Sequence, residues 1–283
     1  MRTWLFVPGH DTHKVQKALH TAADVVIVDW EDAVPPERKH EARAITRSIL
    51  AQESPSPRCV IRINSRYDPA FADDIARLAE LPISAVLLPK AAGPNDVMDL
   101  AGAVRQPIIP LIESALGVES AFVIARAHPQ IERLAFGSLD FLADLGVRWQ
   151  PQDPASQYAR ARIAIASRAA GLGGPIDTVY PQLDDDDGLR RDAGTARALG
   201  FVGKFLIHPT QIGVVRDVFA PTPDEVRQAT EIIQAFQQAR SQGQAAVRVG
   251  GTFIDPPVVR WAEYIVSIHA ADAAGGQADH TRS

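Results

Sequence analysis

Residues 25–32 read VVIVDWED, a run of four apolar residues that leads directly into three acids within four positions. The run is continuously apolar rather than alternating, which is typical of a strand buried on both faces of a parallel sheet. Parallel sheets belong to α/β proteins, whose ligands bind at the carboxyl ends of the strands. The acids at the end of this run are therefore candidates for a functional site.

Similar apolar runs recur as far as residue 208, separated by longer stretches with helical periodicity. We predict eight strands, at residues 4–7, 25–29, 59–64, 85–89, 108–113, 134–136, 176–180 and 204–208. The predicted helices between them cover residues 13–22, 37–52, 71–80, 95–104, 116–127, 155–171 and 189–200. Eight strands alternating with helices give the count that closes a (β/α)8 (TIM) barrel, an α/β fold. An open doubly wound sheet shares this local pattern, but polar residues at nearly every strand end favour a barrel with one mouth.

The rest of the chain is predicted to be an addition to this barrel. The barrel is expected to occupy residues 1–220, and residues 221–272 to form a C-terminal helical and lid extension. A hairpin is expected near residues 247–255, between two helices. Residues 273–283 are small and polar, which is typical of a disordered tail.

The composition excludes several classes of protein. A charged fraction of 22% and a net charge of −5 give no basic surface suited to nucleic acid or anionic lipid. The single cysteine, Cys59, excludes an internal disulfide framework and fits a reducing compartment. The first apolar run is too short for a signal peptide, and no later stretch approaches a membrane span. We therefore expect a cytoplasmic protein without nucleic-acid or membrane partners.

Two acids, Glu113 and Asp140, each follow a predicted strand, and these two strands are successive. Two carboxylates delivered to the same barrel mouth make half of an oxygen-ligand site for a hard cation such as Mg2+. The pair therefore points to an enzyme with a metal centre.

Other charged residues lie at or just beyond the ends of the second and third predicted strands. Crowded acids such as Glu31 and Asp32 repel each other unless a cation or a hydrogen-bond donor lies among them. A favourable interaction with the N-terminus of a helix would explain one of these acids, but not all of them. Arg62 brings a planar, permanently charged group suited to a substrate carboxylate. A salt bridge between Arg62 and the acids is the alternative, and the two interpretations are compatible.

Three further features are open to more than one interpretation. Lys90, after the fourth strand, can form a Schiff base or act as a counter-charge to the acids, and the second interpretation is favoured. His208 can contact a ligand or pack as a neutral core imidazole. The acidic run at residues 184–187 is typical of a solvated loop and a helix start rather than of a metal site.

Eight motifs in order give the chain a resemblance to a known family. They are LFVPG (5–9), ADVVIVDWEDAV (23–34), RIN (62–64), LPK (88–90), IES (112–114), FGSLD (136–140), GFVGK (200–204) and IHPTQI (207–212). With them, the chain from Arg2 to about His269 resembles the citrate lyase β-subunit-like proteins of the HpcH/HpaI aldolase/citrate lyase superfamily.

The resemblance implies a barrel enzyme, usually a homotrimer, that cleaves or forms a carbon–carbon bond beside an acyl thioester. It implies that Glu113 and Asp140 hold Mg2+, and that Arg62 binds the carboxylate of an α-keto acid or its adduct. Relatives place a catalytic aspartate on a C-terminal lid that reaches a neighbouring subunit, and the matching position is Asp255. Lys17 matches a lysine that approaches the coenzyme A phosphates.

The expected function is a Mg2+-dependent carbon–carbon lyase that acts on a citryl- or malyl-type coenzyme A thioester. Arg62 and Asp255 are its expected catalytic residues. Besides Arg62 and Glu113, its substrate-binding residues are expected to include Glu31, Asp32, Lys90 and Lys17. A thioesterase on malyl-CoA-like substrates is one alternative, and a citrate lyase β subunit that needs partner subunits and a carrier protein is another.

The sequence also departs from the family pattern at two places, in the residues that follow the first and the second predicted strands. Trp30 stands where the family usually has leucine, which predicts altered packing beneath the site. The arginine often found after the first strand has no counterpart at His10 and Asp11.

Overall fold

The computed structural model describes residues 1–52, 58–243 and 245–280. The chain divides into two compact units, Met1–Phe219 and Ala220–Ser283. Within the described residues, no helix is long and apolar enough to cross a membrane.

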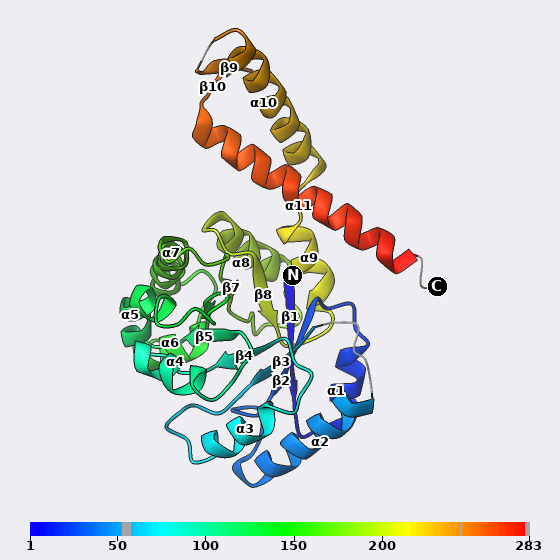
Figure 1. Ribbon diagram of the computed structural model, residues 1–283, viewed down its shortest axis with the longest axis vertical. Coiled ribbons are helices and arrows are strands. Elements are labelled where there is room, and N and C mark those ends of the chain that lie inside the picture. The colour runs from blue at the N-terminus through cyan, green and yellow to red at the C-terminus, as the bar shows by residue number, and fades with distance from the viewer. Residues whose placement is uncertain (53–57, 244, 281–283) are drawn as a thin grey trace. The chain divides into compact units, whose positions relative to one another are not determined.

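The first unit is a closed barrel of eight parallel strands in chain order (Figure 1). The strands are β1 (Thr3–Pro8), β2 (Val25–Asp29), β3 (Arg58–Arg62), β4 (Ala85–Leu88), β5 (Ile108–Ile112), β6 (Ala135–Phe136), β7 (Ile176–Asp177) and β8 (Gly203–Leu206). Strand β1 pairs with both β2 and β8, so the sheet has no free edge. The predicted (β/α)8 barrel is thus confirmed, and the open-sheet alternative is wrong.

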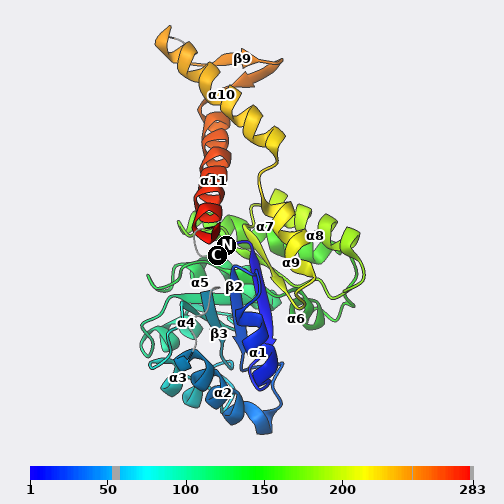
Figure 2. The same cartoon turned by 90° about the vertical axis from the view of Figure 1, so that its right-hand side faces the viewer.

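Helices surround the strands of this unit (Figure 2). They are α1 (Thr12–Leu19), α2 (Lys39–Gln52), α3 (Phe71–Leu78), α4 (Pro94–Ala101), α5 (Ala115–Ala125), α6 (Ser138–Asp144), α7 (Pro154–Ala169), α8 (Asp186–Ala198) and α9 (Gln211–Phe219), with a 3-10 turn, η1, at Pro36–Arg38. Helices α6 and α9, which are seven and nine residues long, were not predicted from the sequence. The acidic run at 184–187 is the start of α8, as predicted, and Asp185 caps that helix.

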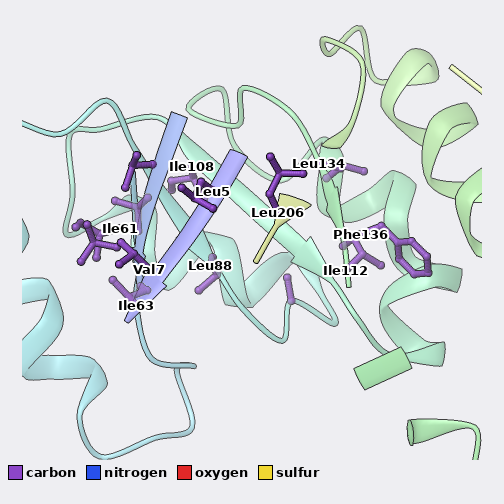
Figure 3. Close-up of a cluster of buried hydrophobic side chains, with 14 of the residues drawn as sticks. Leu5, Val7, Ile61, Ile63, Leu88, Ile108, Ile112, Leu134, Phe136 and Leu206 are labelled. Carbon is purple, nitrogen blue, oxygen red and sulfur yellow. The ribbon is translucent and has the colours of Figure 1, made fainter. Parts of the chain in front are cut away.

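Side chains along each strand alternate between the barrel interior and the surrounding helices. The interior cluster draws on all eight strands and contains Trp4, Val25, Ile27, Val60, Ala85, Leu87, Ile109, Leu111, Ala135, Ile176 and Phe205. The outer cluster packs strand side chains against the helices, and Figure 3 shows Leu5, Val7 and Ile61 among its members. Because both faces are buried, the strands read as continuous apolar runs. The same alternation directs Asp29 and Arg62, which follow Ile27 and Val60 by two residues, to the interior side.

A buried group of four charged residues lies on the outer side of the last two strands. Lys204 of β8 is fully buried, and its Nζ lies 2.6 Å from carboxylate oxygens of both Asp177 and Asp192. The guanidinium of Arg160 donates to the same two acids at 2.8–3.1 Å. Two cations and two acids balance here, as buried charges require. This quartet ties β7 and β8 to α7 and α8.

The second unit consists of two helices and a hairpin: α10 (Pro223–Ser241), β9 (Val247–Val249), β10 (Thr252–Ile254) and α11 (Pro256–His280). Thr222 caps α10 and shares a capping box with Glu225. The predicted hairpin is confirmed, and its turn uses Gly250 and Gly251 at positive φ. Helix α11 continues through the segment where a disordered tail was expected, as far as His280, and residues 281–283 lie outside the described part.

Candidate active site at the barrel mouth

The site begins with a charged pair across β2 and β3. Asp29 and Arg62 are register partners in the parallel ladder. The Nε of Arg62 donates to Asp29 Oδ1 at 2.8 Å, and its Nη2 donates to Oδ2 at 2.6 Å. The guanidinium also lies 4.9 Å from the centroid of the Phe6 ring. Burial opposes the charge, but Asp29 and Glu31 outweigh it and raise the pKa of Arg62, so this group stays positive.

Glu31 lies between two cations. One of its carboxylate oxygens is 3.1 Å from Arg62 Nη1, and the other is 2.8 Å from Lys90 Nζ. Both oxygens are shielded from solvent, and neither meets hydrogen-bond geometry with a described residue. Burial raises the pKa of Glu31, against the lowering by Arg62 and Lys90. Charge rather than directed hydrogen bonds therefore holds this carboxylate.

Lys90 follows β4 with a left-handed backbone, at φ 55°. This conformation brings its backbone N–H within 2.6 Å of Glu113 Oε1. Its Nζ lies near Glu31 and is 3.5 Å from Asp32. Burial alone would lower the pKa of Lys90, but the adjacent carboxylate of Glu31 raises it. A protonated amine is no nucleophile, so the geometry favours a counter-charge over a Schiff base.

Glu113 stands directly after β5 and is 5% exposed. Its Oε2 accepts no hydrogen bond from the described residues. A Cβ on Gly137 would come within 2.8 Å of that oxygen, so the glycine of FGSLD leaves this space open. Burial, followed by the charges of Glu31 and Asp140, raises the pKa of Glu113 to about 8.

Asp140 lies in the first turn of α6. The start of that helix is fixed because the backbone N–H and the hydroxyl of Ser138 both lie 2.9 Å from the Thr178 hydroxyl on the β7 side. Burial and the charge of Asp32 raise the pKa of Asp140. Asp140 and Glu113 thus lie beyond the carboxyl ends of the adjacent strands β6 and β5, and the charge of Asp140 raises the pKa of Glu113.

The donor set fits a hard divalent cation. Asp29, Glu31, Asp32, Glu113 and Asp140 contribute five acids against the two cations Arg62 and Lys90. Over the described ranges, no three His, Cys, Asp or Glu residues form a metal cluster. A cation at Glu113 and Asp140 would therefore take its remaining oxygen ligands from substrate and water, as Mg2+ commonly does.

The structure brings together Glu31, Asp32, Arg62, Lys90, Glu113 and Asp140 of the predicted site. Lys17 is exposed in the last turn of α1, and its predicted role stays untested. Asp255 belongs to the second unit, where its Oδ1 accepts a 3.4 Å hydrogen bond from the Val258 backbone at the start of α11. Its predicted catalytic role also stays a prediction.

Two sequence interpretations change. The core-imidazole interpretation of His208 is wrong, because this residue is exposed and its Nδ1 lies 2.8 Å from the Thr210 hydroxyl. Asp29 is one of the three acids noted at the end of the second predicted strand, but it was not among the expected catalytic, substrate-binding or metal residues, although it makes the shortest contact to Arg62. The sequence signal for Asp29 was its position two residues after Ile27, because residues two apart on a strand face the same side and Ile27 faces the barrel interior.

The substitution at Trp30 has a clear local consequence. The indole is fully buried, and its Nε1 donates to the Thr46 hydroxyl of α2 at 3.0 Å. The indole is thus anchored to the neighbouring helix, and the predicted change of packing relative to the family stays a prediction.

A closed parallel barrel whose mouth gathers acids around an arginine and a lysine defines an α/β-barrel protein with a candidate active site. The profile of the HpcH/HpaI aldolase/citrate lyase family matches residues 2–209, and the chain belongs to this family. The predicted family and enzyme class are therefore confirmed.

Characterised relatives span most of the chain. The mitochondrial citramalyl-CoA lyase of Rattus norvegicus is 32% identical over 289 residues, covering 94% of this chain and 85% of the relative. A (3S)-malyl-CoA thioesterase of Cereibacter sphaeroides is 34% identical over 256 residues, covering 90% of this chain and 89% of the relative. The crystal structure of protein CitE from Mycobacterium tuberculosis, in complex with magnesium, acetoacetate and coenzyme A, superposes with a TM-score of 0.81. It is 32% identical and covers 94% of this chain and 97% of that chain.

Proposed function

We propose that this protein is a Mg2+-dependent carbon–carbon lyase that cleaves or forms a citryl- or malyl-type acyl-CoA, with an α-keto acid as the other product or substrate. The observation that carries the proposal is the juxtaposition of Arg62 with Glu113 and Asp140 at one barrel mouth. A keto or hydroxy acid offers a carboxylate to the arginine and oxygens to a cation. The similarity to a citramalyl-CoA lyase, and to a protein that binds magnesium, acetoacetate and coenzyme A, supports the same substrate class.

Each residue has a defined task in this reaction. Glu113 and Asp140 would hold Mg2+, which would supply a Lewis acid for the oxygens of the keto or hydroxy acid. Arg62 binds the carboxylate and fixes its orientation, which lowers the entropic part of the barrier. In the cleavage direction the substrate hydroxyl loses its proton and the carbon–carbon bond breaks. The electron pair passes into the thioester enolate, which takes up a proton.

Two of these tasks need a charge or a proton carrier. The carboxylate of Glu31 raises the pKa of Lys90, and the positive amine can stabilise the negative enolate oxygen. Asp255 is proposed to move the proton, as base or acid according to direction. Because the resemblance places this residue on a lid that serves a neighbouring subunit, the proposal includes a homotrimer. Lys17 is proposed to approach the coenzyme A phosphates, and a cytoplasmic location is part of the same proposal.

The test is turnover of a panel of acyl-CoA and α-keto acid pairs, with Mg2+ and with EDTA. We expect EDTA, Glu113→Gln and Asp140→Asn each to lower kcat/KM at least about a thousandfold, because each removes charge stabilisation worth several kcal/mol. The matched control is Asp187→Asn, an exposed acid in the first turn of α8, which should act like the wild type. Near-wild-type turnover of the Glu113 or Asp140 variant would overturn the metal assignment.

Thioester hydrolysis is the second candidate, and the similarity to a malyl-CoA thioesterase favours it. The products separate the two reactions, because a lyase releases a keto acid and an acyl-CoA, whereas a thioesterase releases the hydroxy acid and free thiol. A citrate lyase β subunit would instead require a carrier protein and its partner chains. Turnover of a coenzyme A thioester by the purified chain alone would exclude that requirement.

A further inference from the structure

We propose that Asp29 is the positioning residue of the site: it fixes the Arg62 guanidinium so that the remaining donors meet the substrate carboxylate. This inference rests on the proposed function, because it concerns the same carboxylate. Asp29 itself is 1% exposed and acts through Arg62 rather than on the substrate.

The carboxylate of Asp29 is held from two sides. Oδ1 accepts hydrogen bonds from Arg62 and from the backbone N–H of Glu31, the latter at 2.9 Å. Oδ2 accepts from Arg62 and from the backbone N–H of Ala33, also at 2.9 Å. Backbone donors cannot turn away as side chains do. The plane of this carboxylate, and with it the plane of the guanidinium, is therefore set by the chain after β2.

The backbone of Asp29 is equally confined. Gly9 donates its N–H to the Asp29 carbonyl at 2.8 Å, and a Cβ on Gly9 would come within 2.8 Å of the same oxygen. On the other side, the N–H of Trp30 donates to the Arg62 carbonyl at 2.9 Å. Both partners of the pair are thus fixed in backbone as well as in side chain.

The guanidinium of Arg62 has N–H donors that its hydrogen bonds to Asp29 do not use. A guanidinium has five N–H donors, and the hydrogen bonds to Asp29 use two of them. The contact between Nη1 and Glu31 is an ion pair at 3.1 Å outside hydrogen-bond geometry. Enough donors remain for a bidentate contact with a carboxylate.

The ion pairs of Arg160, which belong to the buried quartet, differ from the Asp29–Arg62 pair in exposure and in the number of hydrogen bonds. Arg160 of the buried quartet has a 3% exposed side chain, and four hydrogen bonds to Asp177 and Asp192 engage it. The Arg62 side chain is 12% exposed and has one hydrogen-bonded acid. The contrast assigns the quartet to architecture and the Asp29–Arg62 pair to ligand recognition.

The experiment measures binding by calorimetry, with pyruvate and oxaloacetate titrated separately into the full chain in Mg2+. We expect Asp29→Asn to raise the Kd of the keto acid about 10- to 100-fold, because the amide can no longer accept both Arg62 donors. Binding of free coenzyme A should be unchanged. Asp192→Asn is the matched control: it removes a buried acid from the other arginine, so it should lower the melting temperature without changing the keto-acid Kd.

A double-mutant cycle tests whether Asp29 acts through Arg62. The double variant Asp29→Asn/Arg62→Lys should bind no more weakly than Arg62→Lys alone. If Asp29→Asn does not fold, Asp29→Glu displaces the carboxylate by one methylene and should weaken binding in the same direction. Wild-type affinity in either Asp29 variant, or fully additive losses, would overturn the positioning role. If the wild type binds neither keto acid and turns over no pair in the panel, the proposed function fails and this inference fails with it.

Discussion

Neutralising Glu113 should stabilise the metal-free protein. This carboxyl ordinarily titrates with a pKa of 4.5, but in the folded protein its pKa is about 8, chiefly because it is buried. Below pH 4.5 both the folded and the unfolded chain hold the proton. Above it the unfolded chain releases the proton while the folded chain retains it. Stability therefore falls as pH rises from about 4.5 to about 8, and this loss then stays constant.

The magnitude follows from the pKa of Glu113. Each pH unit in this window costs about 1.4 kcal/mol, so the loss reaches about 3 kcal/mol at pH 7 and about 4 kcal/mol at pH 8, and it levels off at about 5 kcal/mol above that. Glutamine keeps the size of the side chain and an oxygen for the Lys90 N–H, but it has no proton to lose. We expect Glu113→Gln to be more stable than the wild type at pH 7, by up to about 3 kcal/mol.

The measurement is urea unfolding between pH 5 and pH 8 in EDTA. The difference in unfolding free energy between Glu113→Gln and wild type should grow with pH, whereas Asp187→Asn should follow the wild type. Mg2+ should in turn displace roughly 0.9 proton at pH 7, since a group with a pKa near 8 is mostly protonated there. Calorimetry in buffers of different ionisation enthalpy measures that release. A pH-independent difference, or Mg2+ binding without proton release, would refute the reasoning.

Two other substitutions test the architecture around the site. Lys204→Met leaves two acids facing Arg160 alone, so the unfolding free energy should fall by about 3–5 kcal/mol in urea melts, and equal stability would contradict the quartet's role. Gly137→Ala places a Cβ against Glu113 Oε2, so Mg2+ affinity measured by calorimetry should fall at least tenfold while circular dichroism stays native. Unchanged Mg2+ affinity would show that this oxygen takes no part in metal binding.

The sequence predicted the residues that come directly after a strand. Glu113, Lys90 and Arg62 follow or end continuous apolar runs, and the carboxyl ends of barrel strands meet at one mouth whatever the exact register. Asp140 could be predicted for the same reason, although the short helix α6 that carries it could not. Local pattern was enough for this part of the site.

The rest depends on register and on tertiary packing. The pairing of Asp29 with Arg62 requires β2 and β3 to align residue for residue, over a separation of 33 positions. The quartet joins Lys204 to Asp177 across 27 positions, on the side of the sheet that faces the helices. Neither relation has a local signature. Lys17 and Asp255 stay predictions because the roles predicted for them involve a thioester and a neighbouring subunit, which contacts within a single chain do not test.

The buried quartet also changes how the motif GFVGK is to be interpreted in related sequences. Lys204 is its last residue, yet it neutralises Asp177 and Asp192 inside the protein and does not face the interior of the barrel. A single replacement among the four would leave a net charge in the core, whereas compensating replacements would not. During sequence divergence these four positions should therefore change together, and the lysine should be lost only with one of its acids. Retention of this motif in a distant sequence then indicates that the quartet joining β7 and β8 to α7 and α8 is kept, and is no guide to the ligand at the barrel mouth.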